Sequence, residues 1–196
     1  INVSVIGEVD KEKITYRNGA NVNDLVVCTG DLGAAYIGLQ ILKREKQIFL
    51  DNPGVQPDLQ GNDYSLQRQL KAEARVKIIE ILKELKIKPT SMIDISDGLT
   101  SEILHLSKHS DVGITIYEDK LPIDHTTMNL ARDLKLNPIF CALNGGEDYE
   151  LLFTISQDYY EKLKKDVDFT IIGHVTDKSE GDNFITNDNT SHPITA

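Results

Sequence analysis

The residues best suited to chemistry lie in residues 92–99, where two carboxylates stand close together in the chain. Asp94 and Asp97 are three residues apart, with the hydroxyl of Ser96 between them. The apolar residues before them predict a strand and the residues after them a helix, so these side chains lie where a strand passes into a helix. Mg²⁺ typically binds one or two carboxylates together with phosphate oxygens, and the amides of a helix N-terminus also favour phosphate. The segment therefore indicates a site for a magnesium-bound phosphate group.

A plainer interpretation of the same segment is structural. Ser96 or Asp97 could cap the following helix, and Asp94 could lie in a surface turn. Spacing alone favours this interpretation. Asp94 argues for a metal ion, because a carboxylate within an apolar strand needs a partner and a metal ion supplies one.

A second candidate segment, residues 144–150, carries a double glycine followed by two adjacent acids. The glycines let the backbone approach a ligand closely, and the side chains of Glu147 and Asp148 are expected to point to different sides. A turn with two solvated acids explains the pattern equally well.

Two further patterns are weaker. Residues 29–35 carry glycines between a predicted strand and helix but match neither the P-loop nor the dinucleotide-binding fingerprint, so a tight turn with close helix packing is favoured. Glu102, His105 and His109 have the spacing of metal ligands on a helix. No second helix supplies the further ligands that such a site needs, so we expect a solvated helix face there.

Strands and helices alternate along the chain and would position these segments. Apolar runs and alternation predict strands at about 25–28, 92–95, 112–117, 149–155, 169–172 and near Phe184. Helical periodicity and helix stop signals predict helices at about 34–46, 73–85, 99–109, 124–134 and 158–165, with a loop at 51–63. This alternation indicates an α/β protein in which helices cover a sheet.

The composition argues against several classes of protein. The chain has 21 Lys and Arg against 31 Asp and Glu, a formal charge of −10, which disfavours a nucleic-acid-binding surface. No apolar run approaches the roughly 20 residues of a membrane-spanning helix, so we expect neither nucleic acid nor membrane as a partner. Cys28 and Cys141 match no metal or redox spacing, which makes the cytoplasm the expected location.

Three segments, in this order and at these separations, resemble those of thiamine-monophosphate kinases, in the superfamily of aminoimidazole ribonucleotide synthetase. Residues 93–99 resemble that family's Asp-x-Ser-Asp-Gly-Leu segment, and residues 142–151 its Gly-Gly-Glu-Asp-Tyr-Glu-Leu segment. Residues 16–20, followed by Asp24 and residues 27–30, match as well. The resemblance covers nearly the whole chain but only the C-terminal part of the family.

The resemblance implies an enzyme that uses ATP and Mg²⁺ to phosphorylate thiamine monophosphate to thiamine diphosphate. It implies a three-layer mixed sheet with helices on its faces, and a homodimer as the full-length assembly. Carried over residue by residue, Asp94 and Asp97 would bind Mg²⁺. Ser96 and Arg17 would contact ATP, and Glu147 would contact thiamine monophosphate. The acceptor phosphate is itself ionised, so no catalytic base is expected.

The resemblance also divides the chain. Residues 1–13, in which Val3, Val5 and Val9 alternate with polar residues as in a strand, are expected to be the remnant of, or connection to, an absent N-terminal domain. Residues 14–196 are expected to form the C-terminal α/β domain. Because the family's N-terminal domain carries further metal-binding acids, we expect this chain alone to be inactive.

One departure from the family and two alternative functions stay open. Ala34 and Ala35 stand where the family usually carries Asp and Ser. The first alternative is another ATP-dependent enzyme of the same superfamily, such as an aminoimidazole ribonucleotide or selenophosphate synthetase. The second is a non-catalytic domain that binds nucleotide or metal.

Overall fold

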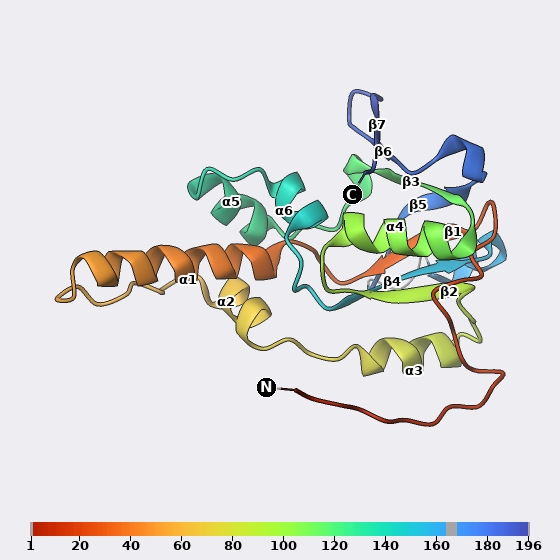
Figure 1. Ribbon diagram of the computed structural model, residues 1–196, viewed down its shortest axis with the longest axis horizontal. Coiled ribbons are helices and arrows are strands. Elements are labelled where there is room, and N and C mark those ends of the chain that lie inside the picture. The colour runs from red at the N-terminus through yellow and green to blue at the C-terminus, as the bar shows by residue number, and fades with distance from the viewer. Residues whose placement is uncertain (1, 164–167, 196) are drawn as a thin grey trace.

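The computed structural model describes residues 2–163 and 168–195 as a mixed sheet with helices around it (Figure 1). The strands in these residues are β1 Leu25–Thr29, β2 Ser91–Ile95, β3 Gly113–Tyr117, β4 Glu150–Ile155, β5 Phe169–Thr176, β6 Asn183–Ile185 and β7 Ser191–Pro193. They lie in the order β2-β4-β1-β5-β3-β6-β7. Among these strands β3 and β6 pair in parallel, and the other neighbours pair antiparallel.

The α-helices in the described residues are α1 Ala34–Asp51, α2 Asp63–Leu70, α3 Val76–Glu84, α4 Leu99–Ser110, α5 His125–Asp133, α6 Pro138–Asn144 and α7 Tyr160–Leu163. Asp124 begins α5 by accepting a hydrogen bond from the Thr126 amide, and Asn137 does the same for α6. Within the described part of the chain, no helix combines the length and apolar character of a membrane span.

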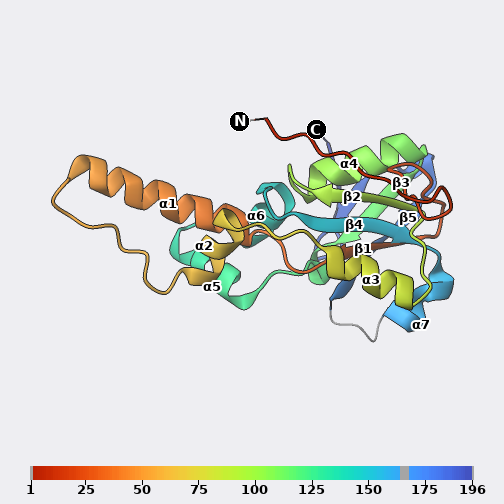
Figure 2. The ribbon, with the colours of Figure 1, turned by 90° about the horizontal axis from the view of Figure 1, so that it is seen from below.

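Helices cover both faces of the sheet, which gives three layers (Figure 2). On one face α4 buries residues such as Leu106 against strand residues such as Ile95. On the other face, α3 and α7 bury Leu82 and Leu163 against Phe153 of β4. The expected three-layer mixed sheet with helices on its faces is therefore confirmed.

A second group of helices packs beside the sheet rather than on it (Figure 1). Its core draws on α1, α2, α5 and α6, through Ile37, Ile41, Leu66, Ala131 and Cys141. Gly38 lets α1 approach α2 closely, since a Cβ atom on this residue would lie only 2.1 Å from the Ser65 carbonyl oxygen of α2. This contact seats α2 against α1, which places the residues after α2 near the sheet.

One edge of the sheet brings together segments that are distant in the sequence. Ile95 at the end of β2 lies opposite Glu150 at the start of β4. β1 also pairs with β4, with Cys28 opposite Leu152, and ends at Thr29. The turns after β1 and β2 and the loop before β4 therefore meet at this edge.

The strands and α-helices predicted from residue 25 onward are present with shifted ends, and two α-helices and one strand were not predicted. The helix expected from residue 73 begins at Val76, and the helix expected at 158–165 is the short α7, beyond which residues 164 and 165 lie outside the described residues. The unpredicted elements are α2, α6 and β7. All three are short. The helices α2 and α6 are stabilised by packing against neighbouring helices, and neither carries a long amphipathic stripe that would reveal it in the sequence.

The alternating N-terminal segment forms no strand in the described structure. Val3, Val5 and Val9 are all exposed, at 79%, 88% and 54%. Alternation produces a strand only where a neighbouring strand supplies hydrogen bonds, and none does so here.

The core on the α3 side should depend strongly on Phe153. This ring is fully buried and packs edge-on against Phe169, with ring centroids 5.9 Å apart. Phe153→Ala should lower the free energy of unfolding by about 3–5 kcal/mol, measured by urea denaturation. Phe140→Ala is the matched control, because Phe140 is 53% exposed, and it should change stability by no more than about 0.5 kcal/mol. Equal losses in the two variants would contradict this assignment of the core.

Candidate active site

Backbone hydrogen bonds join the two acidic segments that the sequence singles out. The Glu147 amide donates to the Ser96 carbonyl oxygen at 2.7 Å, and the Tyr149 amide donates to that of Ile95 at 2.8 Å. Gly146 has a φ of 68°, and a Cβ atom there would stand 2.7 Å from the Ser96 carbonyl oxygen. This glycine therefore lets the two backbone segments approach each other, whereas the sequence suggested the approach of a ligand.

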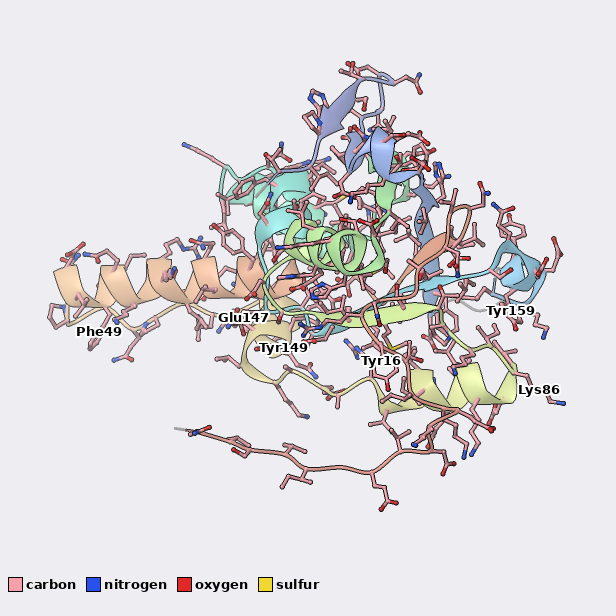
Figure 3. The ribbon with its side chains drawn as sticks, turned by 45° about the vertical axis from the view of Figure 1, so that its right-hand side comes forward. Tyr16, Phe49, Lys86, Glu147, Tyr149 and Tyr159 are labelled. Atoms are coloured by element: carbon pink, nitrogen blue, oxygen red, sulfur yellow. The ribbon has the colours of Figure 1, made fainter. Side chains whose placement is uncertain are left out.

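Asp94, Asp97 and Glu147 have exposed side chains where these segments meet, and we call them the acidic patch. The Tyr149 hydroxyl donates to Glu147 Oε2 at 3.0 Å. That hydrogen bond and the charge of Glu147 raise the pKa of Tyr149, with smaller contributions from burial and from the charges of Asp94 and Asp97. All three carboxylates thus influence the hydroxyl of Tyr149, which lies where the two acidic segments meet. Figure 3 shows Glu147 and Tyr149 together near the end of β2.

The start of α4 is not capped by Ser96 or Asp97. Its N-cap is Gly98, without a side-chain hydrogen bond. Instead, buried Glu102 accepts a hydrogen bond from the Asp97 amide at 3.1 Å, so the expectation that Glu102 is solvated is wrong. The reason is that amides near a helix start need acceptors. The two histidines of α4 are exposed, as expected.

Arg17, expected to contact ATP, is exposed and lies in the segment before β1. The carbonyl oxygen of Tyr16 accepts a hydrogen bond from the Met92 amide at 2.9 Å, which aligns this segment with β2 (Figure 3). Arg17 is therefore adjacent to the strand that carries Asp94. The structure brings the acidic patch together with Ser96 and places Arg17 beside the same strand.

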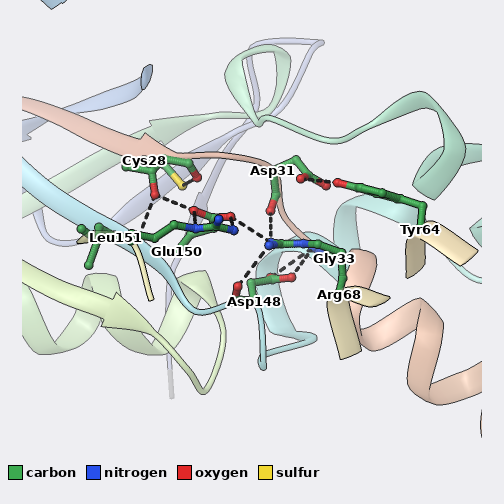
Figure 4. Close-up of polar contacts among 10 residues, drawn as sticks. Cys28, Asp31, Gly33, Tyr64, Arg68, Asp148, Glu150 and Leu151 are labelled. Carbon is green, nitrogen blue, oxygen red and sulfur yellow. Dashed lines mark hydrogen bonds and ion pairs between the residues drawn. The ribbon is translucent and has the colours of Figure 1, made fainter. Parts of the chain in front are cut away.

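A buried network that the sequence analysis did not identify lies next to these segments (Figure 4). Its centre is Glu150, whose side chain is 1% exposed. Arg75 binds both carboxylate oxygens, with its Nε 2.7 Å from Oε2. Arg68 lies 3.0 Å from Oε1, and the Thr29 hydroxyl donates to Oε2 at 2.6 Å. Two guanidinium groups and a hydroxyl thus satisfy the buried charge.

The two adjacent acids of the loop before β4 point to different sides, as predicted. Glu147 is exposed, whereas Asp148 is 2% exposed and its two carboxylate oxygens each lie 3.1 Å from the Gly33 amide that donates to them. Burial raises the pKa of Asp148 to about 7, against the lowering effects of that hydrogen bond and of the Arg68 charge. Asp148 therefore anchors the loop to the turn after β1.

The glycines of the turn after β1 have the structural role that the sequence favoured. Gly30 and Gly33 have φ values of 56° and 86°. A Cβ atom on Gly30 would stand 2.2 Å from the Glu150 carboxylate, and one on Gly33 would stand 3.0 Å from the Ala142 amide nitrogen of α6. Both positions therefore require glycine for close packing.

A polar cavity of about 320 Å³ opens beside the network. Charged residues of both signs line it, namely Asp31, Arg68, Lys71, Glu73, Arg75, Glu150 and Asp168. Arg68 Nε and Asp31 Oδ2 are buried without a hydrogen-bond partner. A polar cavity of this size has room for the ordered water molecules that usually satisfy such atoms.

The acidic patch fits a magnesium ion shared with a phosphate better than an ion enclosed by protein. In residues 2–163 and 168–195, no three or more His, Cys, Asp or Glu side chains are grouped closely enough to hold a metal. Asp94 and Asp97 offer two exposed carboxylates. Mg²⁺ commonly takes one or two carboxylates from protein while phosphate oxygens and water complete its octahedral shell.

The raised pKa of Asp148 predicts a pH dependence of stability. Its ordinary pKa is 3.8 and its pKa in the folded protein is about 7, so between these values the folded state binds more protons than the unfolded state. The free energy of unfolding should therefore fall as the pH rises through this range, by up to about 1.4 kcal/mol per pH unit. Asp148→Asn keeps an oxygen acceptor for the Gly33 amide and should remove this contribution, as measured by urea unfolding across the pH range. A variant with the original slope would show that another group is responsible.

Comparison with known proteins supports the resemblance seen in the sequence. A thiamine-monophosphate kinase of Buchnera aphidicola subsp. Acyrthosiphon pisum is 34% identical over 192 residues, which cover 95% of this chain and 55% of that protein. A solved structure described as AaThiL complexed with AMPPCP and TMP superposes with a TM-score of 0.74 at 30% identity, over 92% of this chain and 52% of that one.

A crystal structure of thiamine monophosphate kinase from Aquifex aeolicus gives a TM-score of 0.71 at 31% identity, over 91% of this chain and 54% of that one. The chain thus spans about half the length of the relatives that it matches. The family model for the AIR synthase related protein, C-terminal domain, matches residues 21–184. Because that match extends from before β1 into β6 and the fold agrees, the chain belongs to the AIR synthase related protein C-terminal domain family.

Proposed function

We propose that this chain is the C-terminal domain of a thiamine-monophosphate kinase, which transfers the γ-phosphoryl group of ATP to thiamine monophosphate in the presence of Mg²⁺. The observation that carries the proposal is the convergence of the two acidic segments, which gathers the acidic patch and Ser96 at one edge of the sheet. The names of the relatives support it, as does the neighbouring structure with AMPPCP and TMP. A homodimer and a cytoplasmic location belong to the same proposal.

In this function Asp94 and Asp97 would hold Mg²⁺, which supplies charge neutralisation at the transferring phosphoryl group. Their carboxylates are exposed, and no ion pair among the described residues involves them. No cationic side chain among the described residues therefore competes with a metal ion for these two carboxylates.

Ser96 and Arg17 would bind the phosphates of ATP. Ser96 precedes α4, whose first turn has no side-chain cap at Gly98; among the described residues Glu102 accepts from the Asp97 amide, and the amides that follow at the helix start would donate to an anion. Arg17 is exposed beside the same strand and would add a positive charge. Together they complement the negative phosphates, whereas the carboxylates complement the metal.

Glu147 would bind thiamine monophosphate. Its carboxylate is exposed and is oriented by the Tyr149 hydroxyl at 3.0 Å. A fixed negative charge suits the cationic thiazolium ring of that substrate. Since the acceptor phosphate is itself ionised, the residues of this site need to position the reactants and have no proton to remove.

Asp97→Asn in the full-length protein tests the metal assignment. The change removes one negative charge from the proposed Mg²⁺ site, so kcat should fall by roughly 100-fold or more while thermal unfolding stays unchanged. Thiamine diphosphate formation from thiamine monophosphate and Mg-ATP is the measurement. Asp133→Asn makes the same charge change at an exposed position of α5 and should keep the wild-type rate. Wild-type kinetics for Asp97→Asn would remove this residue from the site.

The isolated 196-residue chain should form no thiamine diphosphate under the same conditions. It spans about half the length of its relatives, and its described residues present no group of three or more metal-binding side chains. The full-length protein assayed in parallel is the control. Turnover by the isolated chain would contradict this expectation.

A further inference from the structure

We propose that Arg68 is a positioning residue for Glu147: its guanidinium holds, from the buried side, the strained loop that presents the Glu147 carboxylate to the substrate. This inference rests on the proposed function, because it concerns the residue that would bind thiamine monophosphate. It adds α2, a helix outside the two acidic segments, to the parts that the site requires.

The loop that carries Glu147 has an unfavourable backbone conformation. Glu147 and Tyr149 have φ values of 62° and 51°, and Gly146 has a φ of 68°. Residues other than glycine adopt this left-handed region at a cost of roughly 1 kcal/mol or more each. Such a conformation persists only where the surroundings enforce it. Two non-glycine residues in this region, on either side of Asp148, therefore need an anchor.

Arg68 contacts the loop on its buried side, opposite the exposed Glu147 side chain. Its Nη2 donates to the Asp148 carbonyl oxygen at 3.2 Å and to the Asp31 carbonyl oxygen at 3.0 Å, and it lies 3.0 Å from Glu150 Oε1 (Figure 4). The Arg68 side chain is only 13% exposed, so these contacts lie on the buried side of the loop. One guanidinium thus connects the turn after β1 with both ends of the segment 148–150.

Arg75 makes a comparison possible because it binds the same carboxylate. Its contacts among the described residues go to Glu150, through both oxygens, whereas those of Arg68 also reach the loop backbone. If Arg68 is removed, Glu150 keeps Arg75 and the Thr29 hydroxyl, so the charge of Glu150 stays paired. The main loss is then the contact of Arg68 with the loop backbone, which leaves the hydrogen bonds of the Asp148 carboxylate to the Gly33 amide as the side-chain anchor of the loop.

The test is a double-mutant cycle in the full-length protein, read as kcat/KM for thiamine monophosphate. Arg68→Met should lower kcat/KM by roughly 10- to 100-fold, because a displaced binding group costs about that much. In the Glu147→Gln background the same change should cost less than about threefold, because the group that Arg68 positions is already lost. Arg75→Met is the matched control and should cost the same factor in both backgrounds.

Equal losses for Arg68→Met in the two backgrounds would overturn the proposal, because they would show that Arg68 acts independently of Glu147. Should Arg68→Met fail to fold, Arg68→Lys replaces it, since Lys keeps the charge but its terminal nitrogen is one bond closer to the backbone than the Nη2 atom that contacts all three acceptors. For Arg68→Lys, too, a smaller loss of kcat/KM in the Glu147→Gln background supports the proposal, and equal losses in the two backgrounds overturn it.

Hydrogen exchange at the Glu147 and Tyr149 amides provides a readout that does not need activity. Both amides donate to the strand end at residues 95 and 96. Their exchange should accelerate by roughly tenfold or more in Arg68→Met and stay at the wild-type rate in Arg75→Met. Equal exchange in the two variants overturns the positioning role. A wild-type protein without kinase activity overturns the proposed function instead, while exchange still decides whether Arg68 holds the loop.

Discussion

The structure around the candidate site depends on one buried charge, the carboxylate of Glu150. At 1% exposure this group needs partners, and it takes them from three separate parts of the chain, as Arg68, Arg75 and Thr29. Losing one partner of a buried pair generally costs more than forming the pair contributes. The pairing therefore holds the long segment between α1 and β2, which contains Arg68 and Arg75, against the sheet at the start of β4. This contact lies next to the loop that carries Glu147.

Charge is arranged differently on the two sides of that loop. On the buried side, carboxylates and guanidinium groups neutralise one another around Glu150. On the exposed side, no ion pair among the described residues involves Asp94, Asp97 or Glu147. The paired charges give rigidity, and the unpaired charges are available to cations from solution.

Local patterns made most of the fold predictable, because strand alternation, helical periodicity and caps such as Asp124 act over a few residues. The opposite orientations of Glu147 and Asp148 could also be predicted. The Glu150 network could not, because its partners come from positions 29, 68 and 75, and no spacing rule relates residues so far apart. Glu102 was misjudged for a more local reason: its position in a helix suggested solvent, whereas its carboxylate is buried and accepts a hydrogen bond from the Asp97 amide, just before the helix.

The placement of Glu147 outside and Asp148 inside makes the number of residues in this loop as important as their identity. Gly146 packs against the Ser96 backbone, and Glu150 pairs with Ile95 as the first residue of β4. Residues 147–149 must therefore span the distance between these two fixed positions. A deletion of one residue would bring Asp148 to the surface or draw Glu147 toward the buried guanidinium of Arg68. Homologous chains that share this architecture are thus expected to vary here by substitution and to exclude insertions and deletions.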